Sequence, residues 1–221
     1  MSNYGQSFFR MVSEKTYQTV AVIGDGLASG IIDEELIKSF PILGTLASTY
    51  GSYIGIRDAV YLKKLQNFLI EIDKINEDLK LEFIAQNMAD PMQQERFGMT
   101  VFKIVESNED ARKFTLYSAL FEHMFMGEVS YSDTMRLCIM IDKAFYDDIV
   151  NIINIRCGEI DNEPYAEALQ LNNFIKIKGL DFGGIDSDGS ELKKGVIYEK
   201  NKLGHIMTKV VKAHLNTNDM S

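Results

Sequence analysis

Apolar residues recur at intervals of three and four positions from residue 57 to residue 155, and this spacing constrains the fold more than any other feature of the chain. Such a repeat places one apolar stripe along an α-helix. The clearest runs are Leu62, Leu65, Leu69, Ile72, Ile75 and Leu79; Phe97, Val101, Ile104 and Val105; Phe114, Tyr117, Phe121, Met124 and Phe125; and Leu137, Ile141, Phe145, Ile149 and Ile152. Because nothing between them alternates as a strand does, the spacing excludes a parallel sheet of alternating strands and helices. We therefore predict an all-α body.

Local signals suggest where these helices begin and end. Asp90 followed by Pro91 has the chemistry of a cap and a first-turn proline. Ser107 and Ser130 each precede an acidic residue by three positions, just before an apolar run, and predict two further helix starts. Gly127 is a predicted left-handed helix stop.

Two of the runs predict long, unbroken helices. The stripe from Leu62 to Leu79 indicates one helix, and the run through Ile152 indicates a single helix from about Ser132 to Ile155.

The pattern changes after Gly158. The predicted elements are, in order, a helix at 164–173, a strand at 174–178, a polar turn at 183–190, a strand at 196–198 and a helix at 202–215. This is the order of the latter part of a winged-helix domain. The expected fold is thus mainly α: a multi-helix body over residues 1–157, and a winged-helix-like module with a two-stranded β-hairpin over residues 158–221.

The net charge of −9 argues against general affinity for nucleic acid. Residues 163–221 hold eight Lys and eight Asp or Glu, so the other 15 basic and 24 acidic residues place the whole charge on residues 1–162. A solvated helical surface explains this acidity, with a nucleic-acid mimic as the sharper alternative.

The helix expected before the polar turn has the wrong charge for DNA reading. A winged helix reads the major groove with this helix, which here carries Glu163 and Glu167 and no Lys or Arg. The cations left to touch a phosphate backbone are Lys193, Lys194, Lys200, Lys202, Lys209 and Lys212. A module that contacts protein is therefore the favoured interpretation.

A glycine-rich apolar segment occupies residues 17–56. Its start, Thr19 to Ile23 followed by Gly24-Asp25-Gly26, resembles the turn that places a pyrophosphate on a helix N-terminus. The context does not fit, because no acidic residue follows a second strand where the ribose contact belongs. Small residues that allow close packing are the simpler explanation.

The second half of that segment, Pro41 to Ile56, is uncharged. Gly51 and Gly55 have the spacing that lets helix backbones approach, with Gly44 upstream. Because the stretch is shorter than the ~20 residues of a bilayer span, we expect a buried helical hairpin. Insertion into a membrane on activation is the alternative.

Catalytic and metal signals are poor. The chain has no nucleophile elbow, Walker loop or zinc-protease motif, and no Cys or His pair has ligand spacing. We predict no catalytic, cofactor-binding or metal-ligating residue, and no enzyme. The two cysteines fit a reducing compartment, and the first residues lack the order of a signal peptide, so we expect a cytoplasmic protein.

Three stretches carry a family resemblance. They are the run from Asp33 to Leu69, with Pro41-Ile42-Leu43-Gly44, Ile56-Arg57-Asp58 and Leu62-Lys63-Lys64-Leu65; the run Gly127 to Tyr131 that leads into Asp142 to Phe145; and the run Tyr198 to Gly204. In these stretches, which cover most of the chain after residue 20, it resembles the Abi-alpha (abortive infection alpha) group of bacterial proteins. The chain has Glu199-Lys200-Asn201 where a Thr or Ser helix cap is expected, although Asn201 can also cap.

The resemblance implies a role in bacterial defence against phage. We expect the chain to act there through protein–protein contacts or self-association. Alternatives are a membrane-active effector that inserts residues 17–56, through 41–56 above all, and a winged-helix transcriptional regulator. If the glycine-rich hairpin and the helix after it form the working element, we expect Arg57→Ala or Asp58→Ala to impair function. The candidate interaction residues are Gly44, Gly51, Gly55, Arg57, Asp58, Lys193, Lys194 and Lys202.

Overall fold

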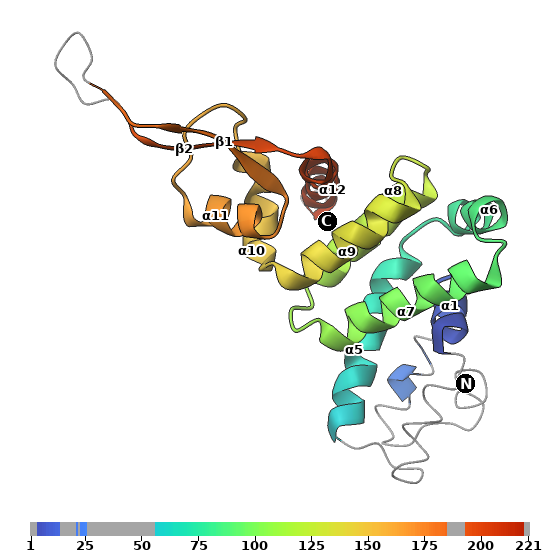
Figure 1. Cartoon of the computed structure of the whole chain (residues 1–221). Helices are drawn as coiled ribbons and strands as arrows, with labels where there is room; N and C mark the ends of the chain where they lie inside the picture. The colour runs from blue at the N-terminus through green and yellow to red at the C-terminus, as the bar shows by residue number, and fades with distance from the viewer. Residues whose placement is uncertain (1–3, 14–20, 22, 26–55, 185–192, 219–221) are drawn as a thin grey trace. The chain divides into compact units, whose positions relative to one another are not determined.

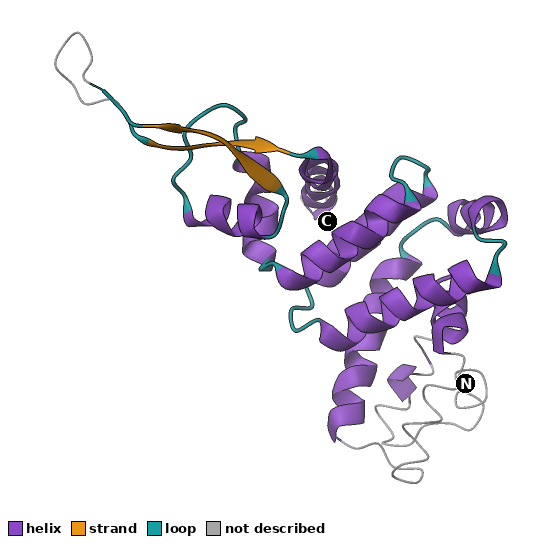
Figure 2. Ribbon diagram, viewed as in Figure 1, coloured by secondary structure: helices purple, strands orange, loops and turns teal. Residues whose placement is uncertain are grey.

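The computed structural model describes residues 4–13, 21, 23–25, 56–184 and 193–218, and these form two compact units, Met1–Glu128 and Val129–Ser221 (Figure 1). The described part contains ten helices and one antiparallel two-stranded hairpin, which a final helix follows (Figure 2). The prediction of a mainly helical protein with a C-terminal hairpin is confirmed.

The described residues of the N-terminal unit form helices joined by short turns, with no strand among them. Its helices are α1 (Tyr4–Ser13), α5 (Ile56–Asp73), α6 (Glu77–Asn87), α7 (Pro91–Ser107) and α8 (Lys113–Phe125). Aromatic rings form the centre of the core, where Phe68 on α5 meets Phe114 and Phe121 on α8 edge to face, at centroid distances of 5.7 and 6.4 Å. Phe97 on α7 lies 5.5 Å from Phe121. Such ring pairs add stability beyond the area that they bury.

Helices α1 and α7 cross at two glycines. A Cβ on Gly98 would overlap the carbonyl oxygen of Gly5 and lie 2.8 Å from the amide nitrogen of Phe9. A Cβ on Gly5 would collide in turn with the backbone of Glu95. The backbones therefore approach as closely as helices can, and Phe8, buried completely, fills the core beside the crossing.

Residues 21 and 23–25 are helical, so they do not form the strand and glycine turn of a dinucleotide site, the interpretation that the sequence context disfavoured. Ile23 is buried, and a Cβ on Gly24 would lie 2.9 Å from Nε2 of Gln66 on α5. Gly24 is thus a position of close packing, as the simpler explanation held.

Several predicted helix ends are confirmed. The Asp90 carboxylate accepts the amide of Met92 at 3.0 Å, with Pro91 in the first turn of α7. Ser130 Oγ accepts the amide of Asp133 at 3.2 Å at the start of the next helix. Gly127 ends α8 with φ +75°.

Two expectations for this unit are wrong. The stripe from Leu62 to Leu79 is divided between α5 and α6, because the Asn76 side chain accepts the amides of Asp78 and Leu79 at 2.8 and 3.4 Å and starts a new helix. Ser107 starts no helix: it ends α7, where its hydroxyl donates to the carbonyl of Lys103 at 2.6 Å.

The C-terminal unit combines short helices with the hairpin. Its elements are α9 (Tyr131–Lys143), α10 (Tyr146–Val150), the 3-10 helix η1 (Asn151–Asn154), α11 (Pro164–Leu171), β1 (Ile175–Asp181), β2 (Gly195–Lys200) and α12 (Lys202–Asn218). The predicted strands and flanking helices are all present. The side chain of Asn201 caps α12 by accepting the amide of Gly204 at 2.9 Å.

The single helix expected from Ser132 to Ile155 is wrong. Ala144 and Phe145 are extended, with ψ 154° and 142°, and separate α9 from α10. The break lets Ile149 and Ile152, both completely buried, turn toward α11 and α12. The structure accordingly groups α9, α10 and η1 with the hairpin, whereas the sequence suggested a boundary between residues 157 and 158.

Candidate interaction surface of the C-terminal unit

Residues 155–163, which we term the strap, run along the outer edge of β2. The amide of Gly158 donates to the carbonyl of Tyr198 at 3.1 Å, and the amide of Asp161 donates to the carbonyl of Val196 at 2.9 Å. Ile160 forms a β-bridge with Ile197 between these bonds. The strap therefore occupies one edge of the hairpin, and the order across it is strap, β2, β1.

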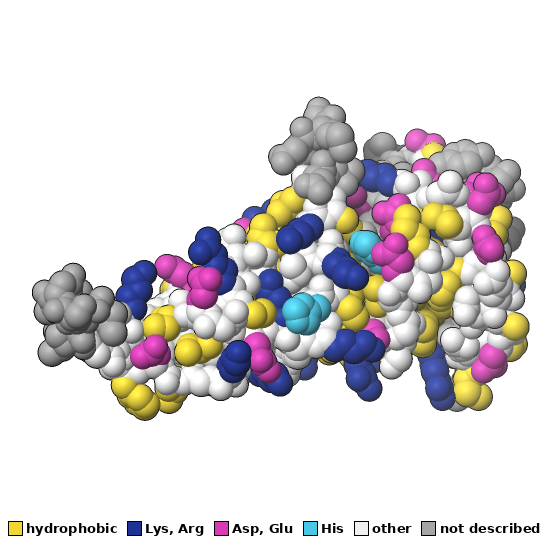
Figure 3. Space-filling view, turned by 90° about the horizontal axis from the view of Figure 1, so that it is seen from above, with side chains coloured by type: hydrophobic (Ala, Val, Ile, Leu, Met, Phe, Trp, Pro, Cys, Tyr) yellow, Lys and Arg dark blue, Asp and Glu magenta, His cyan; other side chains and the backbone are white. Residues whose placement is uncertain are grey.

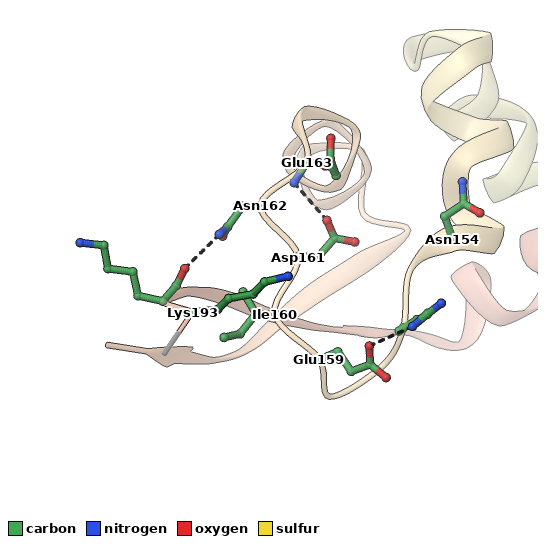
Figure 4. A pocket seen from close by; sticks show the side chains of 9 residues that line it. Asn154, Glu159, Ile160, Asp161, Asn162, Glu163 and Lys193 are labelled. Atoms are coloured by element: carbon green, nitrogen blue, oxygen red, sulfur yellow. Dashed lines mark hydrogen bonds and ion pairs between the residues drawn. The ribbon is translucent and has the colours of Figure 1, made fainter. Parts of the chain in front are cut away.

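A hollow of about 680 Å³ opens between the strap and the start of β2 (Figure 4). Its nine lining residues are Asn154, Arg156, Glu159, Ile160, Asp161, Asn162, Glu163, Lys193 and Lys194. Two predicted interaction residues, Lys193 and Lys194, thus lie together at its rim. The lining holds three carboxylates, those of Glu159, Asp161 and Glu163, beside the cations Arg156, Lys193 and Lys194. Its mixed charges suit polar contacts.

Two of the lining side chains hold the hollow in shape. Asn162 Nδ2 donates to the carbonyl of Lys194 at 3.0 Å, and Asp161 Oδ1 accepts the amide of Glu163 at 3.0 Å. A Cβ on Gly195 would meet Cγ2 of Ile160 at 2.6 Å, so the strap lies close against β2 here. The strap and the base of the hairpin are therefore a fixed pair.

A bulge in β1 directs apolar side chains to one face of the hairpin. Ile177 lies opposite Tyr198, and after a register shift Leu180 lies opposite Val196. Cross-strand partners share a face, and so do residues two apart on one strand. Ile177 and Leu180 therefore face the same side although they are three residues apart. The extra residue of the bulge makes this possible.

The apolar face of the hairpin begins in the core and continues beyond it. Ile175 and Tyr198 are buried near α11 and α12, whereas Ile177 and Leu180 are 51% and 58% exposed. Phe182, just after β1, is 84% exposed. We term Ile177, Leu180 and Phe182 the hairpin patch. Hydrophobic side chains are visible at the surface of the hairpin on the left of Figure 3.

Lys202, a third predicted interaction residue, joins two helix starts. Its Nζ lies 2.6 Å from Oδ2 of Asp133, which also accepts the hydroxyl of Ser130 at 2.8 Å. The hydrogen bonds from Lys202 and then Ser130 hold the pKa of Asp133 below its usual range. Lys202 thus links the N-terminus of α12 to that of α9.

The other candidates fall in the N-terminal unit. Gly44, Gly51 and Gly55 lie outside the described residues, as does nearly all of the 17–56 segment. Arg57 and Asp58 lie in the first turn of α5, and their side chains are not described.

Sequence reasoning missed the hairpin patch. The alternation at residues 174–178 predicted a half-buried strand but not that its apolar face extends past the core. Gly179 was the available signal, because a glycine inside a strand often marks a bulge.

Within the described ranges of the chain, no group of three or more His, Cys, Asp or Glu is placed to hold a metal ion. No described helix combines the length and the apolar character needed to cross a bilayer. Comparisons with family models, with curated proteins and with solved structures found no match.

Proposed function

We propose that the protein is a non-enzymatic, cytoplasmic binding protein that acts in bacterial defence against phage, and that its C-terminal unit contacts a protein partner through the hairpin patch. The exposed continuation of the hairpin's apolar face carries this proposal. The defence role rests on the resemblance of the chain to the Abi-alpha group.

Apolar burial would supply the binding energy. Phe182 and Leu180 are among the most exposed large apolar residues of the described chain, and they lie on one hairpin. Covering a Leu or Phe side chain contributes about 1.5–3 kcal/mol when it becomes fully buried. Lys193 and Lys194 precede Gly195, which pairs with Asp181, so they place charge next to the apolar end of β1, as at the polar rim of protein interfaces.

The unit is winged-helix-like in its order of strap, α11, β1, loop, β2 and α12. It departs from a DNA-reading helix-turn-helix in the stretch before β1. There, α11 follows the nine-residue strap, whereas a helix-turn-helix joins its two helices by three or four residues. α11 also carries Glu167 in its first turn and no Lys or Arg. These features favour a module that contacts protein.

The proposal is tested by phage challenge of cells that express the chain. We expect wild-type protein to reduce plating of at least one phage in a panel, and the double variant Leu180→Ser/Phe182→Ser to lose that protection at unchanged protein level. The matched control is Leu81→Ser/Met92→Ser, which removes two apolar side chains of the N-terminal unit that are 49% and 58% exposed. The control is expected to protect as the wild type does.

A photocrosslinking residue at position 182 tests the contact itself. We expect a discrete protein adduct from position 182 and none from position 92, with self-association giving an adduct of twice the chain mass. Equal protection by the double variant and the wild type would contradict the role of the hairpin patch. Absence of protection across the panel would contradict the defence role.

A further inference from the structure

Helix α12 has a solvent face made of basic residues. Lys202, His205, Lys209 and Lys212 are all exposed, and they follow one another at intervals of three, four and three residues. At 3.6 residues per turn they fall within an arc of about 80° and over a length of roughly 15 Å. We term these four residues the α12 stripe.

No acidic residue of α12 neutralises the positive charge of the α12 stripe. From Lys202 to Asn218, α12 contains no Asp or Glu. Among the described residues, Lys202 has an ion pair, with Asp133, whereas Lys209 and Lys212 have none. Two neighbouring cations on the stripe are thus left for a ligand.

The charge of Lys212 also acts on Lys200, the last residue of β2. Burial is the main cause that lowers the pKa of Lys200, and the positive charge of Lys212 lowers it further. The Cys157 thiol raises the pKa of Lys200. Lys200 is half-buried at the end of β2. Positive charge therefore accumulates where the hairpin joins α12, and Figure 3 shows Lys and Arg side chains over this part of the surface.

We propose that the α12 stripe binds the phosphodiester backbone of nucleic acid, independently of base sequence. The backbone of a duplex carries one negative charge per ~1.7 Å, so it meets several cations along a 15 Å rod at once. Lysine binds phosphate as a point charge and needs no base contact. This surface is separate from the hairpin patch and does not depend on the function proposed above.

Two other polyanionic partners fit the helix less well. An interfacial helix must offer an apolar face to the lipid, but the apolar residues of α12, Met207, Val210 and Val211, are buried in the unit. An acidic protein segment would find no exposed large apolar side chain on the stripe to anchor it. A nucleic-acid backbone requires neither an apolar helix face nor an exposed apolar side chain.

An acidic protein can still bind nucleic acid through the α12 stripe, because its excess of acidic residues lies in a different part of the chain. The net charge of −9 lies outside residues 163–221, which are neutral as a whole. Non-specific binding at low salt follows the local cluster of cations, and it weakens steeply as salt rises.

Fluorescence anisotropy of a labelled 20-bp duplex DNA with the full chain tests the proposal. We expect a Kd on the order of 10 μM at 50 mM salt, and a log Kd that changes with log salt with a slope of about 3. In K209Q/K212Q we expect the slope to fall by about 2 and the affinity at 50 mM salt to fall roughly 100-fold. The single variants K209Q and K212Q are each expected to lower the slope by about 1.

The matched control is K63Q/K103Q, which removes two exposed lysines of the N-terminal unit and changes the net charge equally. We expect it to bind DNA as the wild type does. A duplex RNA of the same length should bind with a similar slope, because the contact is to the backbone.

Three outcomes would overturn the proposal. They are no binding of either duplex at 50 mM salt, an equal loss of affinity in K63Q/K103Q, and binding of vesicles that contain anionic lipid without binding of DNA or RNA. Circular dichroism of each variant shows that the fold is retained, which the exposure of both lysines leads us to expect.

Discussion

The two units of the chain use glycine and apolar side chains in opposite ways. In the N-terminal unit, Gly5 and Gly98 have no side chain where α1 and α7 cross, so the two helices approach closely. The aromatic residues of these helices and their neighbours are then buried in a closely packed core. In the C-terminal unit, Gly179 stands next to the β1 bulge with nothing within 4 Å of its would-be Cβ. There the backbone irregularity turns Leu180 outward, onto the exposed apolar face. The same kinds of residue therefore build a closed core in one unit and an open surface in the other.

The largest effect is expected from the aromatic core. Phe68→Ala removes a completely buried ring that contacts Phe114 and Phe121, and should lower the free energy of unfolding by about 3–5 kcal/mol. Urea denaturation followed by far-UV circular dichroism measures it. Ile70→Ala, on the same helix but 42% exposed, is the control and should cost less than about 1 kcal/mol. Similar losses in the two variants would contradict a closed core at Phe68.

A smaller effect is expected from the glycines, and it should differ between the units. Gly98→Ala forces α1 and α7 apart because its Cβ overlaps the backbone of Gly5, and should cost about 1–3 kcal/mol. The Cβ that Gly179→Ala adds has open space around it. The substitution mainly lowers the conformational entropy of the unfolded chain, so it should be neutral or should stabilise the fold by up to about 1 kcal/mol. Urea midpoints of both variants decide the point. A tolerated alanine at position 98 would show that the crossing is looser than the structure has it.

The smallest effect concerns acid stability of the C-terminal unit. The pKa of Asp133 is lower in the folded protein than its ordinary value of 3.8. The ionised carboxylate therefore stabilises the fold fully at pH values above 3.8, and this stabilisation is lost as the pH falls through the lowered pKa of the folded state. We expect Asp133→Asn to cost about 1 kcal/mol at pH 7 and to show less further loss than the wild type between pH 4 and pH 2. Hydrogen exchange of peptides from α9 and α12 reports on this unit.

Glu167→Gln is the control for Asp133, since it removes an exposed carboxylate of the same unit. It should leave both the stability at pH 7 and the acid sensitivity unchanged. An Asp133→Asn variant as acid-sensitive as the wild type would show that the Lys202 contact does not hold these helix starts together.

Helix class and several helix ends could be predicted from the sequence because their causes are local. The Asp90 and Ser130 caps bind amides two and three residues ahead, and the Gly127 stop needs only its own φ. Apolar spacing likewise reports which side of a helix is buried, and the residues of the α5, α7 and α8 stripes are buried as expected.

The breaks at Asn76 and at Ala144 and Phe145 could not be predicted in the same way. Apolar spacing continues across both, since a stripe looks the same whether one helix or two successive helices carry it. Phe145 belongs to a predicted stripe and is nevertheless 79% exposed, because the chain leaves the helix there. Packing of Ile149 and Ile152 against α11 and α12 decides that geometry.

By itself, the sequence determined the helical class, the hairpin with its following helix, and the caps, because each depends on residues within about four positions of one another. Tertiary structure alone decided which surfaces stay open. It set the bulge that brings Leu180 to the side of Ile177, the strap along β2, and the pairing of Lys202 with Asp133, which lie 69 residues apart. Contacts at such separations form only when the whole unit is packed, so no local pattern encodes them.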